Sequence, residues 1–359
     1  MSRLVVATTG PGTSVQDGGR FGAQRYGLTP SGAVDRLALA AANRLVGNAQ
    51  FSAAIEIGPL NAVFTASEGA VRVALTGAAR PADLAGRAVA LNASITLADG
   101  ESLNLGVARG GVFSYLAIEG GVQGEVMFGS LAVNARAGLG SPYPRPLQAG
   151  DTLQVTAASG APERRIDLPA LKDGPIRLVM GPQDDEFGDG KALLLDSEWR
   201  ISATSDRMGY RLEGPAIKHL YGHNIVSDGT VNGSIQIPGN GQPIVLMPDR
   251  GTTGGYPKIA TVISADLGRF GQTQAGRSFR FKAVSMAEAQ AEYRAMAGLL
   301  RSLPERVHDA NALVLDVEAL HSANVAGHAV NAFDVRTWQT HHPADAQDLD
   351  SFTQADTPS

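Results

Sequence analysis

A glycine pair and a proline come directly before a single lysine in the stretch TTGGYPK, residues 252–258. Strand-forming residues flank it on both sides, at 233–244 and 259–267. Glycine lets the backbone adopt positive φ and approach another group closely, and Pro257 restricts φ just before the lysine. The pattern predicts a rigid turn that presents Lys258 beside an apolar strand. The alternative is an ordinary glycine-rich turn with an incidental surface lysine.

Short strand-like runs continue on both sides of this stretch. Between residues 70 and 160, Val71, Val73 and Leu75 alternate with other residues, and Gly, Pro, Asp and Asn separate the runs. Breaks at about 8 to 12 residues are expected of β-sandwiches and barrels. Residues 157–175 are typical of a linker. The sequence therefore predicts a mainly β fold with two β-rich domains and a few peripheral helices.

Two helices are predicted. Apolar residues from Val34 to Val46 recur at helical spacing, and Gly47 follows as a C′ residue. The segment Ser285–Glu288 has the form of a capping box. The predicted domain bounds are 1–160 for an N-terminal β-rich domain with one helix, 174–284 for the second domain, 285–340 for a helical extension and 341–359 for a disordered acidic tail.

Composition narrows the function classes. The chain has 359 residues, a net charge of −5 and no cysteine. It lacks the basic stripe of a nucleic-acid-binding protein, and without cysteine it has neither thiolate metal ligands nor a cysteine nucleophile. No metal site is predicted from its histidines. Neither a signal-peptide core nor a membrane helix is visible, so we expect a cytoplasmic location.

Several blocks in order along the chain resemble the biotin-dependent carboxyltransferase family. They include GTSVQDGGR at 12–20, SGAVD at 31–35, SDRMGYRLEGP at 205–215, SDG at 227–229 and the TTGGYPK stretch. This family includes the C subunit of 5-oxoprolinase, allophanate hydrolase subunit 2 and a domain of urea carboxylase. The resemblance implies that the second domain is a cyclophilin-like barrel.

The resemblance also implies an activity and partners. The expected reaction is ATP-dependent opening of the 5-oxoproline lactam to glutamate, together with the B subunit of a 5-oxoprolinase and a lactam-utilisation protein, its A subunit. Alternatives are carboxyl transfer from carboxybiotin, as in urea carboxylase, and a regulatory protein that antagonises a kinase inhibitor. The chain has no phosphate-binding loop, so we expect ATP to bind to a partner protein and the chain alone to lack ATPase activity. Without a Met-Lys-Met attachment signal, biotin would arrive on another protein.

Three residues are candidate catalytic groups: Lys258, Glu56 and Asp228. Lys258 or a backbone N–H near Gly254-Gly255 could stabilise a developing oxyanion, and Glu56 or Asp228 could protonate the leaving nitrogen. Strand alternation puts Glu56 on the face opposite Ile55 and Ile57. It is either solvated there or, if that face lines a cleft, a carboxyl group with a raised pKa.

The candidate substrate-binding residues lie mostly in the family-like blocks. The fork of Arg207 could hold a substrate carboxylate, and a glutamine can both donate to and accept from a lactam or ureido ring. The alternatives are a surface ion pair for Arg207, a sheet-edge glutamine for Gln236 and a turn aspartate for Asp228. Asp17 and Arg20 are interpreted as structural. The full predicted binding set is Arg207, Tyr210, Gln236, Thr253, Gly254, Gly255 and Tyr256.

Overall fold

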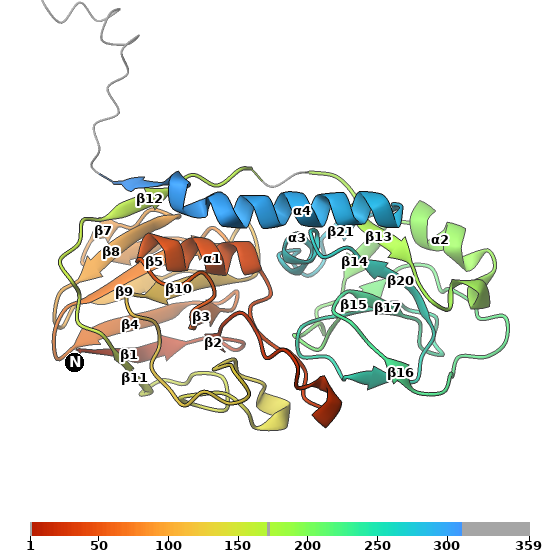
Figure 1. The fold of residues 1–359 in the computed structure, drawn as a ribbon, viewed down its shortest axis with the longest axis horizontal. Coiled ribbons are helices and arrows are strands. Elements are labelled where there is room, and N and C mark those ends of the chain that lie inside the picture. The colour runs from red at the N-terminus through yellow and green to blue at the C-terminus, as the bar shows by residue number, and fades with distance from the viewer. Residues whose placement is uncertain (1, 171–172, 311–359) are drawn as a thin grey trace, which may run out of the picture. The chain divides into compact units, whose positions relative to one another are not determined.

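The computed structural model describes residues 2–170 and 173–310, and in these residues strands predominate over helices (Figure 1). They form several sheets, of which one is a nearly closed barrel. The predicted mainly β fold with few helices is confirmed. None of the described helices is long and apolar enough to cross a membrane.

Two sheets of the N-terminal half pack face to face as a sandwich (Figure 1). The first has the order β11 (Thr152–Val155), β1 (Ser2–Thr9), β4 (Ala62–Ser67), β9 (Ser102–Leu105), β6 (Ala82–Leu84) and β7 (Arg87–Ala88). The second has the order β2 (Ser14–Gln16), β3 (Ala54–Ile57), β10 (Ser114–Ile118), β5 (Val71–Gly77), β8 (Ala93–Leu97), β12 (Arg164–Ile166) and β23 (Val307–Asp309).

The central strands of the second sheet are buried on both faces. In β5 the side chains of Val71, Val73 and Leu75 belong to the core between the sheets. Ala74 on the same strand belongs to the core on the other face, where helix α1 (Arg36–Leu45) covers the sheet. Because side chains alternate along a strand, residues of β5 pack in turn into the sandwich and beneath α1.

Helix α1 begins and ends close to where the sequence predicts. The Asp35 side chain caps its first turn by accepting from Ala38 N at 3.1 Å. Its alanine-rich face lets the helix lie close to the sheet, and the Thr76 hydroxyl donates to the Ala38 carbonyl at 2.7 Å. Gly47 follows with φ +78°, as expected of a C′ glycine.

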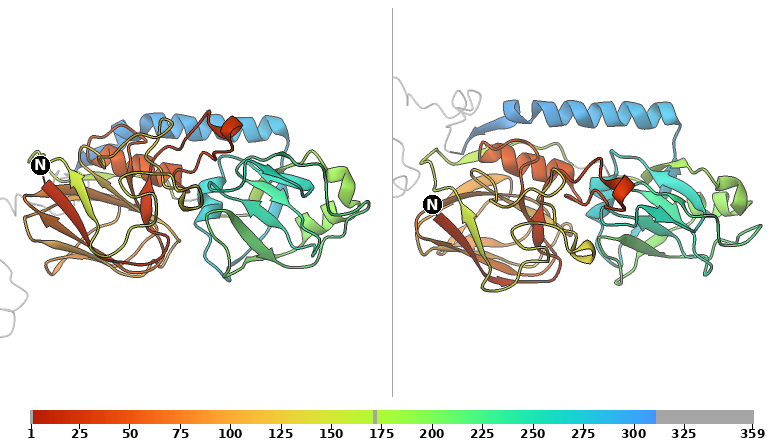
Figure 2. Two further views of the ribbon diagram at one scale, coloured as in Figure 1. Left: turned by 90° about the horizontal axis from the view of Figure 1, so that it is seen from below. Right: turned by 60° about the horizontal axis from the view of Figure 1, so that its bottom comes forward.

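The C-terminal half contains the eight-stranded sheet that curls into the barrel (Figure 2). Its order is β21 (Ser278–Phe279), β14 (Trp199–Ile201), β15 (Gly209–Glu213), β18 (Ile244–Leu246), β17 (Ser234–Gln236), β20 (Lys258–Val262), β13 (Ile176–Met180) and β22 (Phe281–Ala283). A small ribbon pairs β16 (Asp228–Gly229) with β19 (Thr253–Gly254). Helices α2 (Gly190–Asp196) and α3 (Leu267–Gly271) and the 3-10 turn η3 (Asp184–Phe187) belong to this half.

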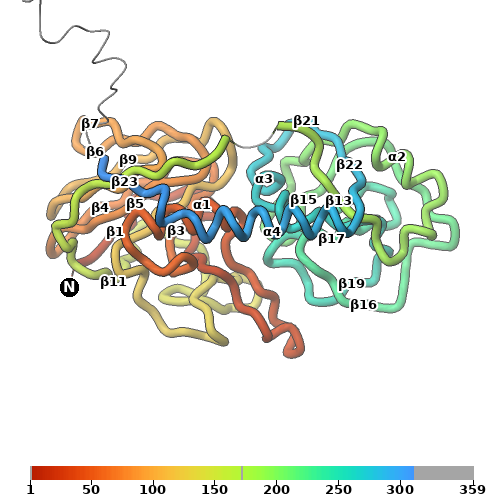
Figure 3. The backbone as a smooth tube through the Cα atoms, turned by 45° about the horizontal axis from the view of Figure 1, so that its top comes forward, coloured from red at the N-terminus to blue at the C-terminus, as the bar shows by residue number. Residues whose placement is uncertain are grey.

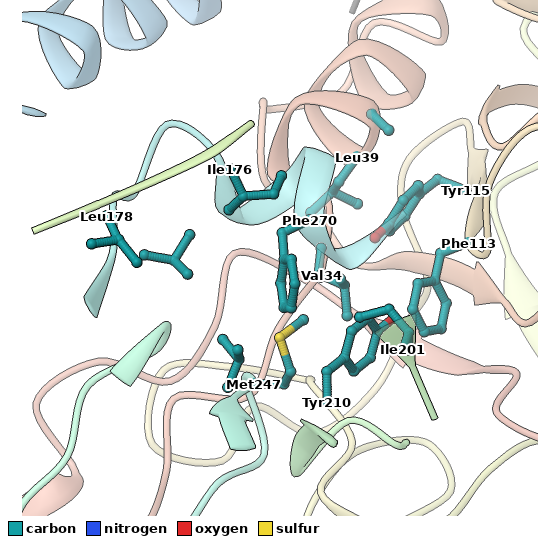
Figure 4. Packing of buried hydrophobic residues seen from close by; sticks show 14 of the residues in the cluster. Val34, Leu39, Phe113, Tyr115, Ile176, Leu178, Ile201, Tyr210, Met247 and Phe270 are labelled. Carbon is teal, nitrogen blue, oxygen red and sulfur yellow. The ribbon is translucent and has the colours of Figure 1, made fainter. Parts of the chain in front are cut away.

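One hydrophobic cluster joins the helical face of the sandwich to the barrel (Figure 4). Val34 and Tyr115 from the sandwich side pack in it with Tyr210, Met247 and Phe270 from the barrel side. A shared core of this kind fixes the two parts against each other, because separating them would expose apolar surface to water.

Helix α4 (Met286–Ser302) leads the chain from the barrel back over α1 (Figure 3). The predicted capping box of Ser285 and Glu288 is present at its start. The helix passes through η4 (Leu303–Arg306) into β23, which pairs with β12. The stretch expected to be a linker thus contains a strand, because β12 finds partners on both sides that are remote in sequence.

The predicted domain bounds stay predictions. Of the helical extension expected at 285–340, the part after 310 lies outside the described residues. The tail expected at 341–359 lies entirely outside them.

Candidate functional site

Lys258 is a buried residue with an ion pair. It begins β20, which lies between β17 and β13 in the barrel sheet, and it is buried. Its Nζ lies 2.8 Å from Oδ2 of Asp228, and the side chains are 4% and 54% exposed respectively. The hydrogen bond from Lys258 holds the pKa of Asp228 below its usual value. The alternative of an incidental surface lysine is therefore wrong, because the side chain is buried and ion-paired.

A turn that only a glycine permits fixes the Lys258 backbone. A Cβ on Gly181 would lie 2.2 Å from the Lys258 carbonyl oxygen, so these two backbone segments approach too closely for any side chain at residue 181. In the same turn, Gln183 accepts from Lys258 N through its Oε1 at 3.1 Å. The side chain of Gln183 also hydrogen-bonds Asp228. Gln183 therefore holds both partners of the ion pair, a role that sequence analysis missed.

The glycine pair acts differently from the prediction. Neither Gly254 nor Gly255 has positive φ, because Gly254 forms part of the extended ribbon of β16 and β19. Gly254 is instead needed for close approach, since a Cβ there would lie 2.4 Å from Nε2 of Gln236. Gln236 is buried and donates to the Tyr256 carbonyl at 3.3 Å. The turn is thus held against the barrel by an amide side chain.

Tyr256 reaches solvent from this turn and lines a cavity. The cavity has a volume of about 450 Å³, and Arg211, Ile244 and Gln242 also line it. Thr253 at the other end of the turn is exposed. The structure therefore brings together five of the predicted site residues around Lys258 and Asp228: Gln236, Thr253, Gly254, Gly255 and Tyr256.

Glu56 and Arg207 form a second group. Glu56 follows the predicted alternation and lies beneath α1, where it is completely buried. Its Oε2 accepts from Val34 N at 2.9 Å and from the Tyr115 hydroxyl at 2.7 Å, and Arg207 Nη1 donates to its Oε1. The solvated alternative for Glu56 is thus excluded. Burial raises the pKa of Glu56, and the charge of Arg207 opposes that rise.

Protein groups occupy the whole fork of Arg207. Its Nε donates to Asp249 Oδ2 at 2.8 Å, and its Nη2 donates to the Gly32 carbonyl at 2.8 Å and to Asp249 Oδ1 at 3.1 Å. Burial lowers the pKa of Arg207, but Asp249 and Glu56 outweigh burial and raise it. The fork that the sequence assigned to a substrate carboxylate therefore holds two protein carboxylates, and the alternative of a surface ion pair is wrong because the pair is buried.

Tyr210 lies in the hydrophobic cluster rather than at the Lys258 turn. Its hydroxyl donates to the Gly271 carbonyl at 2.7 Å, and its ring packs against Phe270 at 5.4 Å (Figure 4). Burial raises its pKa. Residue 210 alternates with Arg211 along β15, and it is Arg211 that lines the cavity beside Tyr256.

Two further residues of this region escaped the sequence analysis. Asp249 closes the Arg207 group, and the adjacent Arg250 is buried with its Nη2 donating to the Thr230 carbonyl at 3.3 Å. Burial lowers the pKa of Arg250. The available signal was position, since PDR at 248–250 comes directly before the turn.

The structural interpretation of Asp17 and Arg20 is confirmed. Asp17 accepts from Gly19 N at 2.8 Å and from the Ser130 hydroxyl at 2.8 Å. Arg20 is buried and donates to the carbonyls of Met127 and Ala132. As for metals, no three His, Asp or Glu side chains converge on a possible ion site within residues 2–170 and 173–310.

The chain is similar in sequence and structure to known proteins. The family model for the carboxyltransferase domain, subdomain A and B, matches residues 26–283. The chain is 36% identical over 312 residues to the 5-oxoprolinase C subunit of Escherichia coli (strain K12), covering 86% of this chain and all of that protein.

Two solved structures also resemble this chain in fold and in sequence. The crystal structure of TTHA0988 is 33% identical with a TM-score of 0.71, over 79% of this chain and 56% of that one, so the chain spans about half of it. The urea amidolyase of K. lactis is 27% identical with a TM-score of 0.77, over 84% of this chain and 20% of that one.

Proposed function

This chain belongs to the carboxyltransferase-domain family, subdomains A and B, and on that premise we propose that it is the C subunit of an ATP-dependent 5-oxoprolinase. It opens the lactam of 5-oxoproline to glutamate together with the B and A subunits of that enzyme. A relative that bears the name of the 5-oxoprolinase C subunit, matched over its whole length, supports this assignment.

The observation that carries the mechanism is the pair of Lys258 and Asp228. Opening a lactam requires water to add to the ring carbonyl, which places negative charge on its oxygen. The C–N bond then breaks as the nitrogen takes up a proton. A buried ammonium suits the first need, because a charge held in a site with little water stabilises an oxyanion strongly.

Asp228 serves the proton transfers. An aspartate is ionised near neutral pH, and Asp228 lies 2.8 Å from Lys258 Nζ, so we assign to it the acceptance of a proton from the attacking water and the delivery of that proton to the leaving nitrogen. Its half-exposed side chain can reach a substrate from solvent. Lys258 therefore binds the developing oxyanion while Asp228 moves the proton.

The other predicted residues divide into two roles. Tyr256, Thr253 and the Gly254-Gly255 backbone border the place where substrate would bind, and Gln236 holds their turn. Glu56 is sealed and Arg207 is fully bonded, so we place both as positioning residues that join the sandwich to the barrel loop at 205–209. ATP binds a partner protein of the complex.

The test is reconstitution. The chain is mixed with the A and B subunits, and ATP-dependent release of glutamate from 5-oxoproline is measured. Glutamate formation that requires all three proteins supports the proposal, whereas a complete complex that hydrolyses no 5-oxoproline contradicts it. ATP hydrolysis by the chain alone would contradict the assignment of ATP to a partner.

Similarity to the urea amidolyase of K. lactis favours one second candidate, carboxyl transfer from carboxybiotin. A carboxyl-transfer assay beside the glutamate assay discriminates between the two functions. Transfer of labelled carboxyl groups from carboxybiotin to urea, without glutamate release from 5-oxoproline, would establish the second candidate.

A further inference from the structure

A second hollow contains none of the predicted site residues. Its volume is about 850 Å³, and it lies between the loops around η1 (Gln24–Tyr26) and η2 (Ala135–Ala137), which come side by side at the lower edge of Figure 1. Five of its lining residues are large and apolar: Phe21, Tyr26, Leu28, Phe128 and Leu139. We name this surface the aromatic hollow.

Three aromatic side chains of the hollow are exposed to solvent. Phe21, Tyr26 and Phe128 are 68%, 61% and 55% exposed. The rings of Tyr26 and Phe128 lie 6.3 Å apart, so the two loops form one continuous surface. Contiguous exposed apolar surface on a folded protein marks a place where another molecule binds.

The backbone holds one of these rings outward at a conformational cost. Phe128 has φ +52°, a left-handed conformation that a bulky residue rarely adopts. Reciprocal hydrogen bonds between Met127 and Ser130 close the turn that contains it, with N–O distances of 3.0 and 3.2 Å. An exposed ring on a strained backbone contributes little to the stability of the fold, and backbone strain of this kind is characteristic of functional positions.

Buried polar anchors keep this turn in place. Ser130 donates to Asp17, and Arg20 donates to the Met127 carbonyl at 3.2 Å, as described above. Arg20 also donates to the Ala132 carbonyl at 2.8 Å on the far side of the turn. The aromatic hollow is therefore a pre-formed surface, which lowers the entropy lost on binding.

The charge of the aromatic hollow indicates the chemistry of the segment that binds there. Segments 20–28 and 126–139 contain three arginines and no acidic residue, although the whole chain has a net charge of −5. Of these arginines, Arg20 is buried and donates to backbone carbonyls, and Arg136 pairs with Asp206, so Arg25 supplies the charge at the hollow. Arg25 lines the hollow over the Tyr26 ring at 4.8 Å, and it forms no ion pair within the described residues. Complementarity calls for an apolar segment that carries carboxylates.

We propose that the aromatic hollow docks an apolar segment of the 5-oxoprolinase B subunit that carries acidic side chains. The choice of this partner rests on the proposed function, in which the chain acts within a complex. The apolar side chains of that segment fill the space between Phe21, Tyr26 and Phe128. A carboxylate of the same segment pairs with Arg25.

The test uses a substitution that should not harm the fold. Asparagine tolerates positive φ far better than phenylalanine, so Phe128→Asn removes the ring and keeps the turn. Binding of the purified B subunit to the full chain is measured by titration calorimetry. We expect at least tenfold weaker binding by Phe128→Asn, with a melting temperature unchanged or higher. Arg25→Glu should weaken binding by a similar factor.

The control removes an exposed aromatic ring elsewhere. Tyr293 on α4 is 59% exposed, and Tyr293→Ser should leave the affinity within twofold. If Phe128→Asn matches the unchanged chain in its affinity for the B subunit, the docking site is elsewhere, while the proposed function stands. If the unchanged chain shows no binding to the B subunit, both proposals fall.

Two other outcomes would also overturn the inference. Light scattering that shows a dimer of the unchanged chain and a monomer of Phe128→Asn would assign the aromatic hollow to a second copy of this chain. Unchanged or tighter binding by Arg25→Glu would overturn the acidic character of the occupant.

Discussion

Replacing Lys258 by methionine separates its chemical role from its structural one. Methionine retains an unbranched apolar stem of similar length and removes only the charge. The partner Asp228 is 54% exposed, so its carboxylate is solvated when the lysine is lost. A substitution that conserves side-chain volume in a packed site costs less than about 1.5 kcal/mol. This predicts a melting temperature lowered by about 2–4 °C per kcal/mol.

Activity should fall far more than stability. Loss of one group that stabilises an oxyanion typically lowers kcat by about 10²–10³, which corresponds to about 2.7–4 kcal/mol. An interaction made mainly in the transition state lowers kcat and kcat/KM together. In the reconstituted complex, Lys258→Met should therefore lose at least a hundredfold in glutamate release from 5-oxoproline with little change in KM.

The control carries the same substitution on an exposed strand of the barrel. Lys282 in β22 is exposed, and Lys282→Met should retain full turnover. Removing Lys258 should also return the pKa of Asp228 towards its ordinary value, which any residual activity would show as an acid limb at higher pH. Turnover of Lys258→Met within threefold of the unchanged complex would refute the oxyanion role.

Three further predictions concern the framework of the site. Gly181→Ala should lower stability by at least about 2 kcal/mol and abolish glutamate release, because its Cβ would meet the Lys258 carbonyl at 2.2 Å; an unchanged free energy of unfolding in chemical denaturation would contradict this. Asp266→Ala should lower stability by about 1.5–3 kcal/mol, because it removes one of the two carboxylates that pair with the partly buried Arg177 at 2.6 Å, while the pair with Glu292 remains. Burial raises the pKa of Asp266, but hydrogen bonds from Arg177 outweigh burial and lower it, so its contribution is present above the ordinary aspartate pKa and lost as pH falls through the lowered value; unfolding measured from pH 5 downwards would check that loss. Because burial raises the pKa of Glu56, the folded chain holds this proton more tightly, and stability should decrease as pH rises from the ordinary glutamate pKa through the raised one. Glu56→Gln should abolish that decrease in a series of urea titrations, and an unchanged slope would show that another group titrates there.

Local sequence determined the features that depend on near neighbours. The capping box at Ser285, the helix that ends before Gly47 and the alternation in β5 follow from backbone preferences within a few residues. The short strand-like runs likewise indicated the mainly β fold, and the family-like blocks indicated the group of residues around Lys258. Each of these signals is contained in a short continuous stretch.

Tertiary structure decided which side chains are buried and what they bind. Strand alternation could place Glu56 opposite Ile55, but only the packing of α1 and the barrel seals that face and supplies Arg207 from 151 residues away. The same holds for Lys258, whose burial and whose partner Asp228 depend on the strand order of the barrel. Burial and ion pairing are sums over contacts remote in the chain, so the sequence could offer Lys258 and Glu56 as charges and could not say whether water or protein surrounds them.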